Sequence, residues 1–251
     1  MYRGHFIQVV IPARDEAILL PRTLQELPTF VDRVLVVDDA STDGTADAAE
    51  ATQRHGLAIA RHEENLGVGG AIVTGYRDAV TRGADIAVVV GADAQMDPTE
   101  MSTLLDPIVE GQADYVKGDR MGHPEVRRRM PRVRYLGNLA LTWLTRRSSG
   151  YRRLRDAQCG YTAINRATLE RLPLADLYPR YGFPNDLLAK LGEVDARVED
   201  RPVTPIYGEE RSGIRVLRVI GPIGLLLLRS GLRRWFRQRG HATPIKSRLP
   251  H

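Results

Sequence analysis

The sequence predicts an α/β fold in which a mostly parallel, doubly wound sheet carries helices on both faces. Short β-branched runs alternate with segments of helical periodicity as far as about residue 118. The composition is globular, because 43% of the 251 residues are hydrophobic and 27% are charged. These values exclude disordered, collagen-like and coiled-coil proteins. The length suits one domain with an appendage and is enough for a full hydrophobic core.

The elements follow from short sequence patterns. Strands are expected over 6–11, 34–37, 57–62, 85–91 and 197–203. Helices are expected after Pro21 and over 44–55, 68–82, 134–148 and 183–191. Pro21 suits the first turn of a helix, and Gly83 suits the end of the helix over 68–82. Beyond residue 120 the alternation is looser, which predicts an irregular C-terminal third.

Several protein classes are excluded by what the chain lacks. A single cysteine, Cys159, excludes a disulfide framework and multi-cysteine metal sites, and it is expected to be a small buried residue. The N-terminus runs into a strand without the pattern of a signal peptide. The longest uncharged apolar run, 219–228, is half the length of a membrane span. A cytoplasmic protein is therefore expected.

Positive charge is concentrated in two blocks. The formal net charge is +5, yet residues 201–251 carry +9 and the rest of the chain −4. Residues 120–155 hold eleven arginines and one glutamate. Such blocks indicate phosphate, nucleic acid or an anionic membrane as a partner. Nucleic acid is not expected, because aromatic residues are only 6% and no nucleic-acid motif is present.

Polar clusters follow four of the expected strands. They cover residues 12–16, 38–45, 65–70 and 91–98. Ligands of open α/β sheets bind at the carboxyl ends of the strands, so these clusters predict one shared site. Ser41 and Asp43 also suit a helix N-cap. The glycines of 67–70 serve either the approach of a phosphate or close packing, and they match neither a dinucleotide fingerprint nor a P-loop.

These motifs, in their order, resemble glycosyltransferase family 2 of the GT-A fold. The similarity rests on IPARDE, VLVVDDASTDGT, NLGVGGA, the Asp93 cluster, DYVKGDR, DAQCGY and RYGFPNDLL. It spans about residues 6–214 and is closest to polyprenyl- and dolichyl-phosphate hexose synthases. The resemblance implies a metal-dependent, inverting enzyme at the cytoplasmic membrane face. Such an enzyme moves a hexose from a UDP-glucose or GDP-mannose type of donor to a polyprenyl phosphate.

The resemblance also assigns a domain plan and a donor site. Residues 1–213 would form the GT-A domain, with a nucleotide-sugar half to about 118 and an acceptor half from about 119. The donor site would comprise Pro12, Glu16, Asp38, Asp39, Asn65, Gly67, Gly70 and Asp93. In the family, the carboxylates of the first two motifs hold the ribose and the base. The alternative is that Glu16 or Asp38 caps a helix.

The metal motif departs from the family pattern. The usual Asp-x-Asp appears as Gly91-Ala92-Asp93, so the first carboxylate is missing. The resemblance implies Mg²⁺ or Mn²⁺ at Asp93 and Gln95, because diphosphate oxygens and water complete the shell of a hard cation. Asp97 is expected to cap a helix that starts at Pro98. The missing carboxylate leaves open a non-catalytic nucleotide-sugar-binding protein.

The acceptor decides which groups the reaction needs. A lipid phosphate is already an anion and needs cations, which Lys117, Arg120, Arg132 and Arg134 would supply by resemblance. Any of these arginines also suits a solvated face. A hydroxyl acceptor needs a general base, for which Asp186 is the first candidate and Asp156 the second. Both aspartates also suit structural roles.

The C-terminal segment, 214–251, is basic and amphipathic. Residues 214–239 combine apolar residues with seven arginines, a composition typical of a helix that lies on an anionic membrane surface. The alternative is a packing or oligomerisation helix, so a homo-oligomer is also considered. The expected partners are a nucleotide sugar, a polyprenyl phosphate and a membrane surface.

Overall fold

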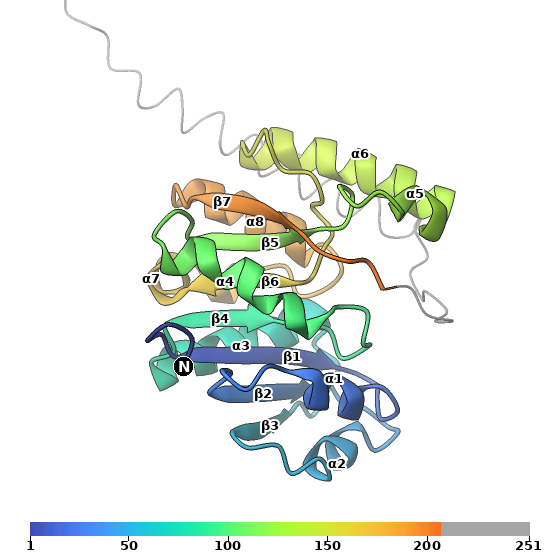
Figure 1. Cartoon of the computed structure of the whole chain (residues 1–251), viewed down its shortest axis with the longest axis vertical. Helices are drawn as coiled ribbons and strands as arrows, with labels where there is room; N and C mark the ends of the chain where they lie inside the picture. The colour runs from blue at the N-terminus through green and yellow to red at the C-terminus, as the bar shows by residue number, and fades with distance from the viewer. Residues whose placement is uncertain (207–251) are drawn as a thin grey trace, which may run out of the picture.

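The computed structural model describes residues 1–206, without the side chains of Arg127 and Arg129. Figure 1 shows one sheet between two layers of helices. The strands are β1 (Ile7–Ala13), β2 (Arg33–Asp38), β3 (Leu57–Arg61), β4 (Ile86–Val89), β5 (Tyr115–Asp119), β6 (Thr162–Asn165) and β7 (Val198–Pro202). The helices are α1 (Leu20–Glu26), α2 (Thr45–Glu50), α3 (Val68–Arg82), α4 (Met101–Val109), α5 (Val126–Arg129), α6 (Arg132–Ser149), α7 (Arg166–Arg171) and α8 (Phe183–Glu193), with 3-10 turns η1 (Pro98–Glu100) and η2 (Leu174–Asp176).

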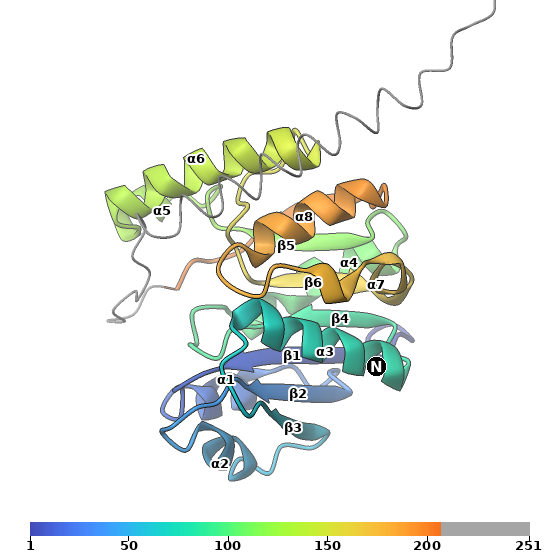
Figure 2. The ribbon, with the colours of Figure 1, turned by 180° about the vertical axis from the view of Figure 1, so that it is seen from behind.

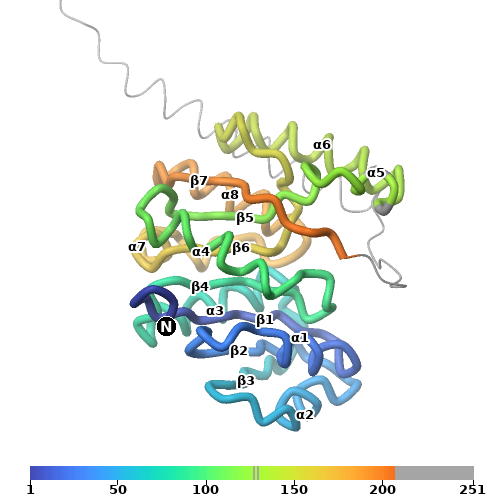
Figure 3. Tube along the Cα trace, viewed as in Figure 1, coloured from blue at the N-terminus to red at the C-terminus, as the bar shows by residue number. Residues whose placement is uncertain are grey.

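The sheet confirms the predicted fold class. Its strand order is β3-β2-β1-β4-β6-β5-β7, as the tube in Figure 3 also shows. All neighbouring strands are parallel except β6, which runs antiparallel to both β4 and β5. Because β6 alone is reversed, the sheet is mostly parallel. The five expected strands form as β1, β2, β3, β4 and β7, whereas the sequence patterns predicted neither β5 nor β6.

Two hydrophobic clusters fix the layers. In strand β1, the side chains of Ile7, Val9 and Ile11 belong to the cluster on one face of the sheet, and that of Val10 belongs to the cluster on the other face. All four side chains are fully buried. Helices α1, α2 and α4 cover the first cluster, and α3, α7 and α8 cover the second. Figure 2 shows the second layer from behind. A strand covered on both faces is mostly apolar, which explains the run FIQVVI, in which the buried Gln8 donates a hydrogen bond to Asp78 at 2.9 Å.

Helix ends follow the predicted signals. Pro21 lies in the first turn of α1, and α3 ends at Gly83, whose φ is 73°. Asp97 caps η1 by accepting a hydrogen bond from the Thr99 N–H at 2.9 Å. Helix α3 also lies very close to the sheet, because a Cβ at Gly75 would be 2.1 Å from Val10 Cγ1. The absence of a side chain at Gly75 therefore lets the backbone of α3 pack directly against Val10 of β1.

The acceptor half holds the outermost helices. Helix α6 begins two residues before the predicted start and, with α5, lies beyond β7 at the end of the molecule opposite α2 (Figure 1). Between residues 1 and 206, no helix combines the length and hydrophobicity needed to cross a membrane. The predicted boundary at 213 and the tail over 214–251 lie outside the described residues.

Candidate functional site

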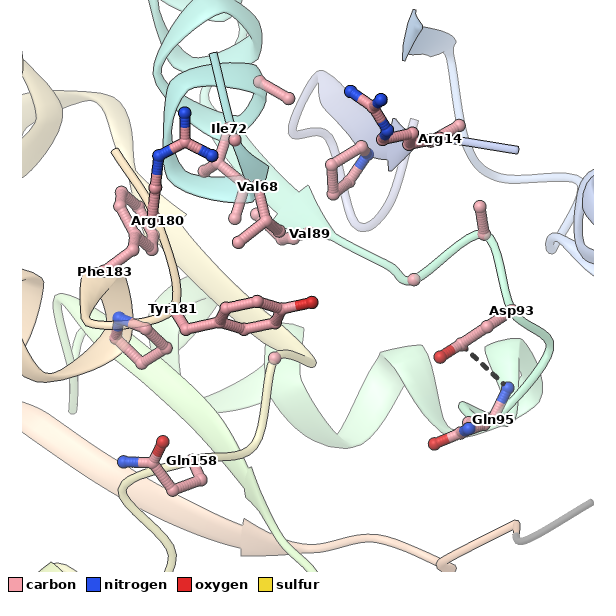
Figure 4. A pocket seen from close by; sticks show the side chains of 18 of the residues that line it. Arg14, Val68, Ile72, Val89, Asp93, Gln95, Gln158, Arg180, Tyr181 and Phe183 are labelled. Atoms are coloured by element: carbon pink, nitrogen blue, oxygen red, sulfur yellow. Dashed lines mark hydrogen bonds between the residues drawn. The ribbon is translucent and has the colours of Figure 1, made fainter. Parts of the chain in front are cut away.

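A pocket of about 550 Å³ lies at the carboxyl ends of the parallel strands. One wall comes from the segments after β1, β2, β3 and β4, and the other from the segment after β5, from α6 and from the segments before β6 and α8. Figure 4 shows Arg14 and Val68 on one side and Gln158 and Tyr181 on the other. The polar clusters that follow the four strands therefore meet, as the sheet topology requires.

Most of the predicted donor residues line this pocket. Pro12, Glu16, Asp39, Asn65, Gly67 and Asp93 are in its wall, whereas Asp38 and Gly70 are not. Asp38 is buried and accepts a hydrogen bond from the Ser41 N–H at 2.9 Å. Among these two neighbouring carboxylates, Asp39 thus faces the pocket and Asp38 holds the turn after β2.

Asp39 organises the segment that leads into α3. Its carboxylate accepts hydrogen bonds from the backbone N–H groups of Leu66 at 2.9 Å and Gly67 at 2.8 Å. His62 Nδ1 lies 2.8 Å from the same carboxylate, and His62 Nε2 lies 3.0 Å from Thr74 Oγ1. Asp39 therefore supports one wall of the pocket, a role for which the sequence offered no signal.

The glycine segment serves close packing. Gly67 has a φ of +86°, and a Cβ there would lie 2.5 Å from the carbonyl oxygen of Pro179. A Cβ at Gly69 would lie 2.5 Å from the carbonyl oxygen of Tyr178. The N–H groups of Gly69 and Gly70 both donate to Pro179 O, at 2.8 and 3.1 Å. The start of α3 is thus joined to the segment before α8, and Gly67 lies in the pocket wall as well.

Ser41 and Asp43 brace the loop after β1. Ser41 Oγ accepts from the Asp15 N–H, and Asp43 Oδ2 accepts from the Ala17 N–H, both at 3.0 Å. Asp43 Oδ1 also accepts from the Thr45 N–H at the start of α2, as a capping residue does. Because these bonds fix both neighbours of Glu16, they hold Glu16 in the pocket wall.

Asp93 and Gln95 line the pocket together. Asp93 Oδ1 accepts from the Gln95 N–H at 3.1 Å (Figure 4). A Cβ at Gly91 would lie 2.8 Å from the same Oδ1, so the Asp93 carboxylate occupies space that a side chain at 91 would need. Within residues 1–206, no three carboxylate, histidine or cysteine side chains could enclose a metal ion. The oxygen donors of Asp93 and Gln95 fit a hard cation that a diphosphate also coordinates.

The four predicted phosphate ligands divide into two groups. Arg120 and Arg134 line the pocket. Arg132 is exposed outside the pocket, and Lys117 is fully buried. Lys117 Nζ donates to the backbone oxygens of Asp156 and Cys159. Lys117 therefore holds the segment before β6, which corrects its expected contact with phosphate.

Asp156 is a fully buried partner of Arg120. Its carboxylate accepts from Arg120 Nε at 2.8 Å, Arg120 Nη2 at 3.2 Å and Asn138 Nδ2 at 3.0 Å. Burial alone would raise the pKa of Asp156, but the charge and hydrogen bonds of Arg120, with Lys117 and Asn138, hold this pKa well below 3.8. Asp156 does not line the pocket, so it positions Arg120 and is not placed to act as a base.

Asp186 also lies outside the pocket wall. It is 4% exposed, and its Oδ2 lies 2.5 Å from Lys190 Nζ and accepts from the Tyr178 N–H at 2.8 Å. These contacts join α8 to the segment before it. Cys159 is buried as expected, and burial raises the pKa of its thiol.

Further pocket residues are ones that the sequence did not single out, and all of them except Asn138 of α6 lie in the motifs quoted above. Arg14, Asn138, Gln158, Arg180 and Tyr181 all line the pocket. Gln158 lies in DAQCGY, and Arg180 and Tyr181 lie in RYGFPNDLL, so the motifs themselves were the available signal. Figure 4 shows the Tyr181 ring extending into the pocket. Arg180 Nη2 lies 3.5 Å from Asn65 O, which links the two walls.

The fold is that of a GT-A glycosyltransferase. Glucosyl-3-phosphoglycerate synthase from Mycobacterium tuberculosis, solved with UDP, superposes with a TM-score of 0.66 at 23% identity, covering 92% of this chain and 80% of that one. The same synthase has been crystallised with Mn²⁺, UDP and glucosyl-3-phosphoglycerate. The chain belongs to glycosyl transferase family 2, whose family model matches residues 8–172.

Two relatives resemble this chain over most of its length. A UDP-N-acetylglucosamine–dolichyl-phosphate N-acetylglucosaminyltransferase from Methanococcus voltae is 30% identical, covering 81% of this chain and 86% of the relative. An undecaprenyl-phosphate mannosyltransferase from Micrococcus luteus is 31% identical, with 81% and 84% covered. The chain is therefore a glycosyltransferase, as its motifs predicted.

Proposed function

We propose that this enzyme transfers a hexose from a UDP-glucose or GDP-mannose type of donor to a polyprenyl phosphate, with inversion, at the cytoplasmic face of a membrane. The observation that carries the proposal is the pocket itself. One wall holds Glu16, Asp39 and Asn65, which suit a nucleotide, and the other presents Arg120 and Arg134, which suit a phosphate. The names of both relatives support a lipid-phosphate acceptor.

The donor half supplies acceptor oxygens for the nucleotide. Asn65 Oδ1 is buried and accepts no hydrogen bond from any described residue. A base N–H or a ribose hydroxyl would satisfy this oxygen, and the Glu16 carboxylate in the same wall is a second acceptor. The nucleotide-sugar half, residues 1–118, would therefore bind the donor, and the half from 119 the acceptor.

Asp39→Asn is expected to raise the Kd for UDP or GDP, whichever binds, by about tenfold or more. Asp39 lies in the pocket wall, and its charge holds the Leu66 and Gly67 N–H groups of that wall through hydrogen bonds that contribute about 1.5–3 kcal/mol, so the change loosens the surface that would bind the nucleotide. Titration calorimetry measures the effect. Asp38→Asn is the matched control, because Asp38 lies outside the pocket wall, and its Kd should stay within about threefold. Equal losses in both variants would contradict the proposed role of Asp39.

The metal would be held by Asp93, with Gln95 beside it. When bound, Mg²⁺ or Mn²⁺ neutralises the charge that develops on the departing diphosphate. Gly91 leaves the protein with one carboxylate here, so the donor's own oxygens would complete the shell. Gly91 also favours a second candidate, a nucleotide-sugar-binding protein without turnover.

The acceptor half would bind and orient the nucleophile. A phosphate oxygen of the acceptor attacks the anomeric carbon from the face opposite the diphosphate, so one C–O bond forms as the other breaks. The phosphate is already an anion, which removes the need for a base. The guanidinium groups of Arg120 and Arg134 would donate hydrogen bonds to the phosphate oxygens. The hydrogen bonds to Asp156 fix the orientation of the Arg120 guanidinium group.

A comparison of two variants tests the lipid phosphate against a hydroxyl acceptor. Arg134→Gln should lower kcat/KM for a polyprenyl phosphate by about 100-fold, because it removes a charged contact worth about 1.5–3 kcal/mol. Asp186→Asn should leave kcat within about threefold, since Asp186 contacts Lys190 and lies outside the pocket. Initial rates at one temperature, corrected for the folded fraction, measure both. Loss of turnover in Asp186→Asn alone would favour the hydroxyl acceptor.

A further inference from the structure

Helix α6 buries polar residues. Its buried side chains are those of Asn138, Thr142, Thr145, Ser148 and Ser149. Thr142 Oγ1 accepts from the Ala157 N–H at 3.1 Å, and Thr145 Oγ1 accepts from Asn185 Nδ2 at 2.8 Å. With the bond from Asn138 to Asp156, these contacts join α6 to the body of the protein by hydrogen bonds. The side chains that α6 buries are therefore all polar, and none of its large apolar side chains is fully buried.

Four large apolar residues of α6 face outward. Val133, Leu136, Leu139 and Trp143 are 69%, 64%, 43% and 60% exposed. At 3.6 residues per turn, they lie within one stripe along the helix, opposite the buried polar residues. Soluble proteins seldom expose a contiguous apolar stripe, and such a stripe usually marks a binding surface. We call these four residues the α6 outer face.

The surroundings of this face are strongly cationic. Residues 126–155 contain ten arginines and no aspartate or glutamate. Arg132 and Arg147, both exposed, lie at the two ends of the α6 outer face. Apolar residues with Trp on the exposed stripe and arginines around it are typical of helices that lie in a membrane interface. A protein partner would need a surface that is both apolar and strongly acidic. An anionic bilayer combines an apolar interior with negatively charged headgroups.

The same helix lies over the pocket. Arg134, Gly137, Asn138 and Leu141 of α6 line the pocket, on the side of the helix away from the α6 outer face. Both ribbon views place α6 at the outer end of the molecule (Figures 1 and 2). The outer face and the pocket are thus separated by about one helix diameter, roughly 10 Å.

We propose that the α6 outer face docks on an anionic phospholipid bilayer. Val133, Leu136, Leu139 and Trp143 enter the interface, and Arg132 and Arg147 contact the lipid headgroups. Docking in this way holds Arg120 and Arg134 about one helix diameter from the headgroup layer, where a phosphate on a membrane-anchored chain can reach them. The docking itself does not require turnover, although its benefit for the acceptor rests on the proposed function.

Tryptophan quenching in the full chain tests the docking directly. The chain has two tryptophans, so Trp235→Phe leaves Trp143 as the sole reporter. Vesicles of phosphatidylglycerol and phosphatidylcholine, with bromines on the acyl chains, should shift Trp143 emission to the blue and quench it by at least half. Vesicles of phosphatidylcholine alone should do so much less, because each arginine adds about 1 kcal/mol at an anionic surface.

Substitutions identify the surface. Leu136→Ser combined with Trp143→Ser should lower the vesicle partition coefficient about tenfold or more in co-sedimentation. Ile18→Ser is the matched control, since Ile18 is 89% exposed and lies outside α6, and its partitioning should be unchanged. Turnover of a short, water-soluble isoprenoid phosphate should persist in the double variant. Its turnover of the same acceptor type in vesicles should fall.

Three results would overturn the docking. If the wavelength and intensity of Trp143 emission do not change when vesicles are added, α6 does not reach the bilayer. Unchanged partitioning of the double variant would assign the membrane contact to another surface. A dimer by light scattering that the double variant abolishes would assign the α6 outer face to a second copy of the chain. Quenching without turnover of any lipid phosphate would retain the docking and contradict the proposed function.

Discussion

Replacing Asp93 by Asn is expected to lower kcat by about 10²- to 10³-fold while the fold is retained, as is typical when one preorganised electrostatic group is removed from an active site. With Gly91 in place of the first motif carboxylate, Asp93 is the single acidic side chain of this motif in the pocket wall. Steady-state rates with a polyprenyl phosphate measure kcat, and thermal unfolding reports the fold.

Asp97→Asn provides the matched control. Asp97 lies four residues further on, outside the pocket wall, and caps η1 through the Thr99 N–H. Because Asn caps a helix about as well as Asp, this substitution should leave both the stability and kcat nearly unchanged. Mn²⁺ binding in the presence of UDP, followed by electron paramagnetic resonance, should weaken in Asp93→Asn and persist in Asp97→Asn. Wild-type Mn²⁺ affinity and kcat in Asp93→Asn would contradict a metal role for this carboxylate.

Replacing Asp156 by Asn is expected to lower the free energy of unfolding by about 3–5 kcal/mol, the usual cost of removing one partner from a buried ion pair. Arg120 would lose its charged partner, and the amide would present a donor to Arg120 or to Asn138. Turnover of a polyprenyl phosphate should fall about 100-fold, because Arg120 is no longer fixed toward the pocket. Urea unfolding and initial rates measure the two effects.

The destabilisation should depend on pH in a defined direction. The pKa of Asp156 is held below 3.8 in the folded protein, so the unfolded chain takes up a proton first as the pH falls. The stabilisation by Asp156 is therefore complete above about pH 4 and is lost progressively at lower pH. The free energies of unfolding of the wild type and Asp156→Asn should converge below pH 4. A constant difference down to pH 2 would show that Asp156 is not the ionised partner of Arg120.

Local patterns sufficed for most of the fold. The run over 6–11 and the helix over 68–82 with its glycine end are specified by neighbouring residues, and both form as predicted. Strand β6 is different, since its four residues, TAIN, have no distinctive period. Its antiparallel place between β4 and β5 depends on pairing with strands far away in the sequence.

The site was predictable where topology alone brings residues together. Parallel strands end at one edge, so the clusters containing Glu16, Asp39 and Asp93 had to meet. Burial of charge was not predictable, because it depends on distant partners: Arg120 and Asp156 are 36 residues apart in the sequence. Lys117 was predicted to bind phosphate because its buried partners, Asp156 and Cys159, are also far away in the sequence. The sequence pattern of a lysine near a basic block is the same whether its side chain faces a pocket or donates to the backbone oxygens of a buried turn.

The mass of the lipid product tests the central claim most directly. Purified enzyme, Mg²⁺ or Mn²⁺ and a polyprenyl phosphate would be mixed with UDP-glucose, GDP-mannose and UDP-N-acetylglucosamine in separate reactions, then analysed by chromatography and mass spectrometry. We predict one new ion, heavier than the lipid phosphate by one hexose, with UDP-glucose or GDP-mannose. Nucleoside diphosphate released only with a soluble alcohol would contradict the lipid acceptor. Binding of UDP or GDP without turnover of any donor would contradict a catalytic role and favour the non-catalytic candidate.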